Sequence, residues 1–431
     1  MRLLVLLALA VVATVCSGKP DPNAKPNENP IQTAAPVFVK QAANGKLYTA
    51  GQGDDKFYLL HVWGTPYEMG FAHGTLLKEE ATDLLDSVWQ YLEDQVIEAI
   101  NGTVKIFRPW FLEDVSNFGL DVALDLEILA TEKYSGKYFL EEIKGLGTAA
   151  GVDYRKIQRI HMLGELTKGD CSMFGAWNSA VPKPGTILQL RALDWNVDGP
   201  FKNHPQVTVY HPNSGNGRAF ANLGWSGWIG SITGMNDRQM AISEIGVSYP
   251  DDSFGSESRF GIPFTYILRD VLQFDNTLDD AVNRMANAHR TCNLILGVGD
   301  GKLGTFRGVQ YSYAVSNFFD DKNLRPDATW HPKIPDVVYW GMDWLDADYS
   351  SVLARQLTKY HGNITAENTI RDITAIVQTG DLHIAIYDLN MNYMYVANAK
   401  KASAKGAIYA YDRAFVKLDM KALFAEMPPQ N

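Results

Sequence analysis

Three side chains in the middle of the chain have the chemistry needed to cleave an acyl bond. Cys171 carries a thiol, and Arg191 and Asp194 follow it at spacings of 20 and 23 residues. A thiol attacks a carbonyl carbon once a base has removed its proton, and a donor or a positive charge must stabilise the oxyanion that forms. These residues therefore supply a nucleophile, a positive charge and a carboxylate for acyl-transfer chemistry.

The elements that must position these residues are predicted to form a β-hairpin. Residues 172–181 and 186–195 are rich in apolar and β-branched side chains, and a turn with two prolines and a glycine separates them. Cys171 is then at the start of one strand, and Arg191 and Asp194 are near the end of its neighbour. Because side chains alternate between the faces of a strand, the arginine and the aspartate need a bulge or a strand end to reach the same site.

The base for this thiol is not indicated by a nearby histidine motif, because the nine histidines are not grouped around the cysteine. Cleavage of the chain between Asp170 and Cys171 would release an α-amino group as an alternative base. Such an amine has a pKa of about 7.7–8 against about 8.5 for a thiol, so the two groups are matched near neutral pH and below. Signal peptidase cannot remove so long a leading segment. The chain would therefore have to cleave itself at this bond.

The start of the chain is typical of an exported protein. One positive charge precedes a short apolar run, which predicts a signal peptide over residues 1–18. A flexible leader is expected over 19–36, a helical N-terminal part over 37–170, and the catalytic part over 171–431. No later segment reaches the roughly 18 uninterrupted apolar residues of a membrane helix, so no transmembrane segment is expected.

Composition excludes several classes of function. At 431 residues and 46% hydrophobic, the chain can bury a large core. The net charge of −10 and the lack of a basic cluster argue against a nucleic-acid partner. No His-Glu-x-x-His or Cys-x-x-Cys spacing occurs, so neither a metal nor another cofactor is expected. The sequons at Asn101 and Asn363 predict glycosylation and suit a secreted or lysosomal protein.

Helical periodicity dominates the sequence up to Asp170, and strand patterns become frequent after it. Helices are predicted over 64–100, 121–133, 137–146, 154–167, 262–273, 277–289, 348–360 and 366–378. Strands besides the hairpin are predicted over 57–63, 206–211, 217–223, 228–234, 239–247, 293–298, 303–309, 383–389 and 393–398. This order indicates an α+β protein in which sheets are layered between helices.

Several segments outside the hairpin also contain distinctive motifs. They are Gly64-Thr65-Pro66-Tyr67-Glu68-Met69-Gly70 with His73-Gly74, Gly234-Met235-Asn236-Asp237, Arg290-Thr291-Cys292-Asn293, Tyr339-Trp340-Gly341-Met342-Asp343-Trp344, and Thr379-Gly380-Asp381-Leu382-His383. Together with the cysteine hairpin, they resemble the N-terminal-nucleophile (Ntn) amidohydrolases of the acid ceramidase, bile-salt hydrolase and penicillin acyltransferase type. The resemblance is greatest to secreted acid-ceramidase-like proteins of amoebae and related protists, and it covers most of the mature chain.

The resemblance implies a four-layer αββα sandwich of two antiparallel sheets, self-cleavage before Cys171, and two fragments that remain associated. Cys171 would supply both the sulfur and the basic amine, and Asp194 would hold that amine. Arg191 would orient the nucleophile and the scissile carbonyl, and Asn293 would donate its side-chain amide to the oxyanion. The implied substrate is a lipid-like N-acyl amide, with ceramide as the leading candidate.

Other positions match the motifs of this family less specifically. Asn236 and Arg307 are candidates for residues that contact the catalytic side chains without touching the substrate. Where bile-salt hydrolases carry a further asparagine, this chain has Glu244 or Ile245. The mechanism needs no imidazole, so His73 is predicted to be structural.

Two other functions remain open at this point. The same fold would suit an acyltransferase or a phospholipase B-like lipid hydrolase. A secreted binding protein without turnover would instead be stapled by a disulfide between Cys171 and Cys292. The tryptophans, including Trp225 and Trp228, are expected to be mainly core residues, with the lining of an acyl pocket as the alternative.

Overall fold

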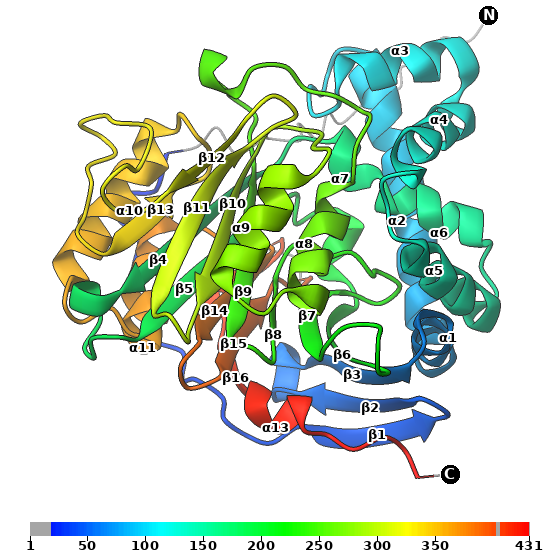
Figure 1. The fold of residues 1–431 in the computed structure, drawn as a ribbon, viewed down its shortest axis with the longest axis horizontal. Helices are drawn as coiled ribbons and strands as arrows, with labels where there is room; N and C mark the ends of the chain where they lie inside the picture. The colour runs from blue at the N-terminus through cyan, green and yellow to red at the C-terminus, as the bar shows by residue number, and fades with distance from the viewer. Residues whose placement is uncertain (1–18, 402–405, 431) are drawn as a thin grey trace, which may run out of the picture.

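The computed structural model describes residues 19–401 and 406–430, so the signal peptide predicted over 1–18 lies outside the described residues. Two β-sheets pack face to face, and helices cover their outer faces (Figure 1). This is the α+β, four-layer αββα arrangement that was predicted. Within the described residues, no helix is both long enough and apolar enough to cross a membrane.

The larger sheet has the strand order β1-β2-β3-β6-β7-β8-β9-β10-β11-β12. Its strands are β1 (Val37–Ala42), β2 (Gly45–Ala50), β3 (Phe57–Gly64), β6 (Pro205–Pro212), β7 (Phe220–Trp225), β8 (Gly234–Asn236), β9 (Met240–Gly246), β10 (Leu294–Asp300), β11 (Thr305–Tyr311) and β12 (Ser316–Phe319). Neighbours are antiparallel except for β3 and β6, which run parallel and are connected by residues 65–204, a long crossover that includes the N-terminal helices and the cysteine hairpin. The sequence analysis missed β1, β2 and β12 of this sheet, and the strands at 337–340 and 416–419 of the smaller sheet.

The smaller sheet carries the cysteine hairpin and has the order β13-β4-β5-β14-β15-β16, all antiparallel. Its strands are β4 (Asp170–Trp177), β5 (Ile187–Asp194), β13 (Val337–Trp340), β14 (His383–Asp388), β15 (Tyr393–Asn398) and β16 (Val416–Asp419). Strands β4 and β5 lie against β9 and β10 of the larger sheet. The inner faces of both sheets are therefore core, and the predicted hairpin is confirmed.

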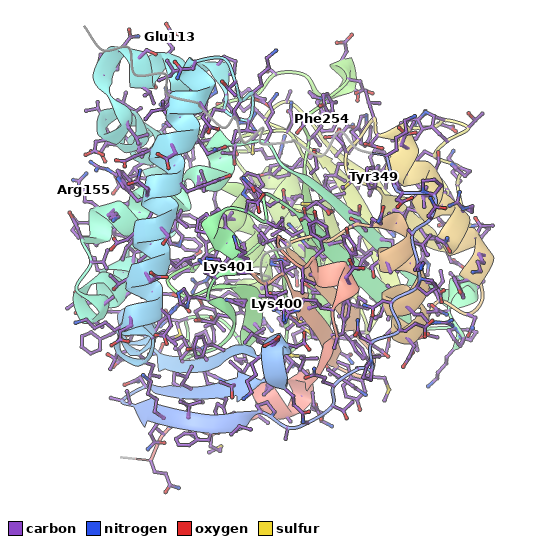
Figure 2. All side chains as sticks on the ribbon, turned by 180° about the vertical axis from the view of Figure 1, so that it is seen from behind. Glu113, Arg155, Phe254, Tyr349, Lys400 and Lys401 are labelled. Atoms are coloured by element: carbon purple, nitrogen blue, oxygen red, sulfur yellow. The ribbon has the colours of Figure 1, made fainter. Side chains whose placement is uncertain are left out.

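The helices form three groups (Figures 1 and 2). The first seven, which precede the hairpin, are α1 (Pro66–Leu76), α2 (Lys78–Ile100), α3 (Pro109–Phe118), α4 (Leu120–Glu132), α5 (Lys137–Ala150), α6 (Tyr154–His161) and α7 (Leu163–Leu166). The larger sheet is covered by α8 (Phe264–Phe274) and α9 (Leu278–Asn287). The smaller sheet is covered by α10 (Ala347–Tyr360), α11 (Ala366–Asn368), a π-helical turn (Thr369–Thr374) and α12 (Ala375–Val377), and α13 (Met420–Phe424) ends the fold.

Figure 2 shows that α2 runs along one side of the molecule, with Glu113 and Arg155 on the helices around it. Tyr349, in α10, lies on the opposite side. The single helix predicted over 64–100 is divided at Leu77, which ends α1 and begins α2. The predicted helix over 154–167 is likewise divided, into α6 and α7.

Glycines in the N-terminal signature allow α1 to lie directly against α5. A Cβ atom added to Gly70 would lie 2.0 Å from the Glu142 carbonyl oxygen, and one added to Gly74 would lie 2.6 Å from that of Leu146. Such distances are far below van der Waals contact, so only glycine fits at these positions. The signature therefore fixes helix packing, and His73 on the same helix is directed into the core.

The predicted flexible leader over 19–36 is attached at two points, to the segment before β16 and to β16 itself. The Asn27 amide donates to the carbonyl oxygens of Tyr411 and Arg413, both at 2.8 Å. The backbone of Gln32 pairs in parallel with Val416 at the exposed edge of β16. A sheet edge has backbone groups that need partners, and this segment supplies them. The leader is therefore held against the fold at these residues.

The two predicted glycosylation sites are exposed. Asn101 lies at the end of α2, and Asn363 follows α10. Both side chains are thus on the surface, as a glycan requires.

Candidate active site

The register of the hairpin decides which side chains share a face. Cys171 pairs with Leu193 and Met173 pairs with Arg191. Directly opposed residues point to the same side of a sheet, as do residues two apart on one strand. Cys171 and Arg191 therefore both face the larger sheet. Asp194 is the last residue of β5, so the strand end that the sequence analysis required is present.

Arg191 forms a buried ion pair with Glu244 of β9. Its Nη2 lies 3.0 Å from Glu244 Oε2, and the two residues are 0% and 5% exposed. Burial raises the pKa of Glu244, and the positive charge of Arg191 opposes this rise. The sequence analysis named Glu244 only as one of two residues in place of an asparagine. The structure places it beside the nucleophile.

Asp194 accepts three hydrogen bonds from the segment after α12. Thr379 Oγ1 donates to its Oδ2 at 2.7 Å, and the backbone N–H groups of Gly380 and Asp381 donate to its Oδ1 at 2.8 and 3.1 Å. A further hydrogen bond of 2.6 Å joins the hydroxyls of Thr379 and Ser172. Burial raises the pKa of Asp194 to about 6, although these donors favour its ionised form. The carboxylate is thus held rigidly at the end of the strand.

The thiol of Cys171 is 2% exposed, and burial raises its pKa well above the ordinary value. Arg191 lowers that pKa, whereas the negative charges of Glu244 and Asp194 raise it. The backbone N–H of Cys171 donates to the carbonyl oxygen of Met342 at 2.9 Å. In the intact chain the sulfur is therefore a neutral thiol that needs a base before it can attack a carbonyl carbon.

The other residues named from the sequence separate into two groups. Asn293 directly precedes Leu294, which lines the cavity described below, and its Oδ1 is buried without a hydrogen-bond partner in the described chain. Asn236 instead bonds to backbone groups of its own turn and of the end of α8, including the carbonyl oxygen of Leu272 at 3.0 Å. Arg307 pairs with Val298 across β10 and β11, and donates to the Phe306 carbonyl oxygen at 3.0 Å. The structure gives both of these residues contacts of their own, and none of those contacts is with Cys171, Arg191 or Asp194.

Cys171 and Cys292 are both free and buried, so the disulfide expected of a secreted binding protein is wrong. Cys171 is the second residue of β4 in the smaller sheet, whereas Cys292 precedes β10 of the larger one. Thr291 Oγ1 lies 3.7 Å from the Cys292 sulfur. Cys292 thus behaves as a small buried residue, and the nucleophile remains available.

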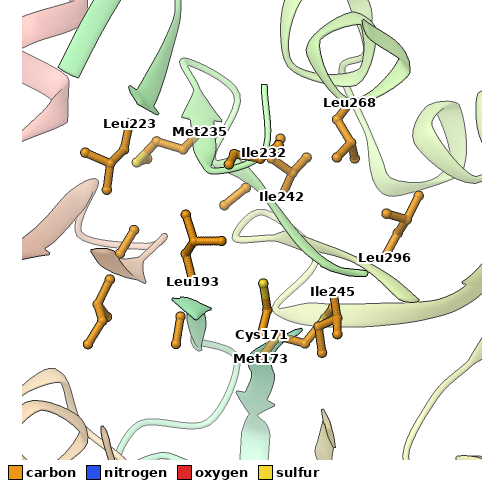
Figure 3. Packing of buried hydrophobic residues seen from close by; sticks show 14 of the residues in the cluster. Cys171, Met173, Leu193, Leu223, Ile232, Met235, Ile242, Ile245, Leu268 and Leu296 are labelled. Atoms are coloured by element: carbon orange, nitrogen blue, oxygen red, sulfur yellow. The ribbon is translucent and has the colours of Figure 1, made fainter. Parts of the chain in front are cut away.

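A mainly apolar cavity opens beside Cys171, and its volume is about 100 Å³. Figure 3 shows Cys171 among Leu193, Ile232 and Ile245, between the two sheets. The wall comes from both sides of the Asp170–Cys171 bond, and consists of Leu163, Gly164, Thr167, Gly169, Cys171, Leu193, Trp195, Phe201, Trp225, Trp228, Ile232, Glu244, Gly246, Phe264, Thr265, Leu294 and Leu382. Trp225 and Trp228 line this cavity, which agrees with the alternative prediction that they line a pocket.

Trp225 ends β7, and the segment after it was predicted as a strand over 228–234; this prediction is wrong up to Thr233, because β8 begins only at Gly234. The backbone N–H groups of this segment do not pair with another strand there. Gly227 donates to His73 Nε2 and Ile229 donates to His161 Nε2, each at 2.9 Å. Burial lowers the pKa of these two imidazoles to about 3 and about 4, so both stay neutral and can accept a hydrogen bond. His73 is structural, as predicted, but its role is to hold a wall of the cavity.

Two buried carboxyl groups give a first testable prediction, because both hold protons near neutral pH. Burial, as the main cause, raises the pKa of Glu127 and of Asp170 to about 8. Their unfolded values lie near 4, so the folded chain binds more protons than the unfolded chain between pH 8 and 7. Lowering the pH over this range should raise the free energy of unfolding by about 1–2 kcal/mol. Urea unfolding of the uncleaved Cys171→Ala chain measures this.

The matched control for that experiment is the same chain with Glu127→Gln and Asp170→Asn added, which should show a flatter dependence on pH. Below about pH 6.5 the buried neutral histidines oppose the gain, because the unfolded chain then binds protons that His73 cannot bind. A free energy of unfolding that falls from pH 8 to pH 7 would contradict the assignment of these protons.

Two proteins of Dictyostelium discoideum match nearly the whole chain. Protein dcd1A is 35% identical over an alignment of 436 positions, which covers 97% of this chain and 97% of that protein. Protein dcd1B is 36% identical over an alignment of 413 positions, which covers 93% of this chain and 81% of that protein. Among solved structures, a Caenorhabditis elegans N-acylethanolamine-hydrolyzing acid amidase (NAAA) ortholog aligns with a TM-score of 0.38 and 16% identity, over 57% of this chain and 100% of that one. No family model matches the sequence.

The expected relationship to proteins of amoebae is thus confirmed. The names of these relatives state no activity, so the expected ceramidase activity stays a prediction.

Proposed function

The chain belongs to the family of the Dictyostelium discoideum proteins dcd1A and dcd1B, and from its site we propose that it is a self-processing cysteine Ntn hydrolase that cleaves a lipid-like N-acyl amide. The observation that supports this most directly is the position of Cys171. Its thiol lines an apolar cavity, and the peptide bond that precedes it joins the first two residues of β4, Asp170 and Cys171, which are both buried. One residue can therefore serve as nucleophile for both self-cleavage and substrate cleavage.

Self-cleavage would proceed by transfer of an acyl group from nitrogen to sulfur. The Cys171 sulfur attacks the carbonyl carbon of Asp170, the new C–S bond replaces the C–N bond, and the departing nitrogen takes a proton to become the α-amine. Water then hydrolyses the thioester, which leaves a carboxylate on Asp170 and restores the thiol. The new amine would lie at the same end of the sheet as Asp194, which is the last residue of β5. The Asp194 carboxylate is suited to stabilise the positive charge of that amine.

In the mature enzyme the freed amine would accept the thiol proton, and the thiolate would attack the amide carbonyl of the substrate. Arg191, held by Glu244, would orient the nucleophile, and Asn293 would donate to the oxyanion. The acyl-enzyme is then hydrolysed by water. Because the cavity wall is mainly apolar, an acyl or alkyl chain suits it, and ceramide is the leading candidate substrate.

The two fragments would remain associated because they share buried contacts. Phe139 of the N-terminal fragment stacks on Tyr266 at 3.8 Å between ring centroids. Arg259 pairs with Asp114 at 2.7 Å, and it lies over the ring of Trp110. These contacts join α3 and α5 to residues that follow Cys171. Export through the predicted signal peptide to the lysosome or the exterior is part of the same proposal.

The test is the intact mass and N-terminal sequence of the purified, non-reduced protein after incubation near pH 5. We expect two fragments that elute together, the second beginning Cys-Ser-Met-Phe-Gly, and release of fatty acid from N-acyl amides that include ceramide. Fragment masses locate the cut to a single bond. A chain that stays whole and inactive after prolonged incubation would overturn the proposal.

A further inference from the structure

We propose that Trp228 and Thr265 form a polar subsite in the wall of the Cys171 cavity, and that this subsite binds an oxygen acceptor of the substrate at a distance from the scissile amide. The inference rests on the proposed amidase function and narrows its substrate to N-acyl amides with a further hydroxyl or carbonyl oxygen.

Polar atoms without partners identify the subsite. The indole nitrogen of Trp228 and the hydroxyl of Thr265 are buried and make no hydrogen bond within the described residues, and both side chains line the cavity. Thr265 is 2% exposed. A buried donor without a partner lowers stability by about 1–3 kcal/mol, so folded proteins have few of them. The indole nitrogen of Trp195 is a third such atom in the wall of this apolar cavity, and together the three indicate that ligand atoms are missing.

The two atoms face the same small space beside Gly230. A Cβ atom added to Gly230 would lie 3.0 Å from Thr265 Oγ1 and 3.4 Å from Trp228 Nε1. Glycine keeps this space open, since any larger side chain would reach into it. Both polar atoms are therefore placed around one point, as two donors to a single acceptor must be.

The surrounding contacts hold both side chains in place before a ligand binds. The Trp228 ring stacks on His161 at 4.5 Å, with 12° between the ring planes. Arg269 Nη1 donates to the carbonyl oxygen of Ile229 at 2.9 Å, directly after the tryptophan. Thr265 lies in the first turn of α8, and its carbonyl oxygen accepts from the Ser231 N–H at 2.9 Å. Donors that are fixed in advance lose little conformational entropy on binding.

The chemistry of the two groups selects the kind of ligand atom. An indole N–H only donates, and a hydroxyl can donate as well. A hydroxyl or carbonyl oxygen can accept from both, whereas a plain alkyl chain would leave both unpaired in a dry cavity. Sites built to bond a substrate hydroxyl reject the analogue that lacks it far more strongly than apolar pockets distinguish single methylene groups.

The experiment compares three probe amides of equal chain length on the processed enzyme. One has no oxygen besides the amide, one has a hydroxyl on its amine part, and one has a hydroxyl on its acyl part. We expect kcat/KM for one hydroxylated probe to exceed that of the plain probe by about tenfold, as two hydrogen bonds of ordinary strength allow. Which probe is preferred shows the side of the amide that lies against the subsite.

The variants Trp228→Phe and Thr265→Val keep shape but remove one donor each. Each should lower kcat/KM for the preferred probe by about threefold to tenfold more than it lowers kcat/KM for the plain probe, and Thr265→Ser should retain the preference. Trp89→Phe is the matched control, because the Trp89 indole donates to Glu93 Oε1 at 2.9 Å outside the cavity. Processing into two fragments shows that each variant is folded.

The outcomes separate the two proposals. If wild type hydrolyses the probes without preferring a hydroxyl, or if both variants slow all three probes alike, the subsite is wrong and the amidase function stands. If no processed preparation hydrolyses any probe, the proposed function is overturned, and the subsite with it.

Discussion

Cys171→Ala is expected to give a full-length chain that folds but neither cleaves itself nor hydrolyses amides. The substitution removes the sulfur that both reactions require, and alanine fits the space of a side chain that is 2% exposed. Loss of a covalent nucleophile lowers kcat by as much as about 10⁶-fold in well-studied hydrolases, so turnover should fall below detection. Intact mass, urea unfolding and fatty-acid release measure the three parts of this result.

Cys292→Ala is the matched control for that experiment. Cys292 is also free and buried, and the cavity wall does not include it. It should therefore process normally and retain activity, with only the small loss of stability that removing a buried sulfur produces. Turnover of the same amide by Cys171→Ala, or cleavage of its chain before residue 171, would exclude Cys171 as the nucleophile.

The hairpin that carries this cysteine is predictable from sequence because its signals are local. The two strands and the turn between them lie within one continuous stretch, so strand propensity and turn residues suffice to pair them. The register of the two strands then places Cys171 and Arg191 on the same face of the hairpin. The reactive residues and the α+β class follow from patterns of this kind.

The partners of those residues are not predictable in the same way, because they come from distant segments. Glu244 reaches Arg191 across 53 residues of sequence, and Thr379 reaches Asp194 across 185. Neither has a local pattern that marks it as part of a site. The Thr379-Gly380-Asp381 motif stood out only through a family resemblance, and spacing alone gives it no role.

Edge strands and loops were missed for other physical reasons. Strand β1 is exposed along nearly all of its length, so no alternation of polar and apolar residues marks it. The loop after β7 looks like a strand by composition, but imidazoles from α1 and α6 take its backbone donors. A tertiary hydrogen bond of this kind overrides local propensity, and sequence patterns do not contain it.

Arg269→Met should destabilise the protein by about 3–5 kcal/mol at pH 7.5, because it leaves a buried carboxylate without its partner. Arg269 and Glu142 are 0% and 1% exposed, and their Nη2 and Oε2 atoms lie 2.5 Å apart. The pair joins α8 to α5, on opposite sides of the Asp170–Cys171 bond. Urea unfolding of the uncleaved Cys171→Ala chain, with and without the substitution, measures the effect.

The double variant Arg269→Met/Glu142→Leu distinguishes loss of the ion pair from loss of packing. Replacing both partners by apolar residues leaves no unpaired charge, so this variant should be within about 2 kcal/mol of the parent. Burial raises the pKa of Glu142, and without Arg269 that carboxyl would take up a proton on folding. The single variant should therefore lose less stability at pH 5 than at pH 7.5, since a protonated Glu142 carries no charge to bury. Equal losses at both pH values, or a double variant as unstable as the single one, would show that Arg269 acts through packing and through its bond to Ile229, and not by compensating the charge of Glu142.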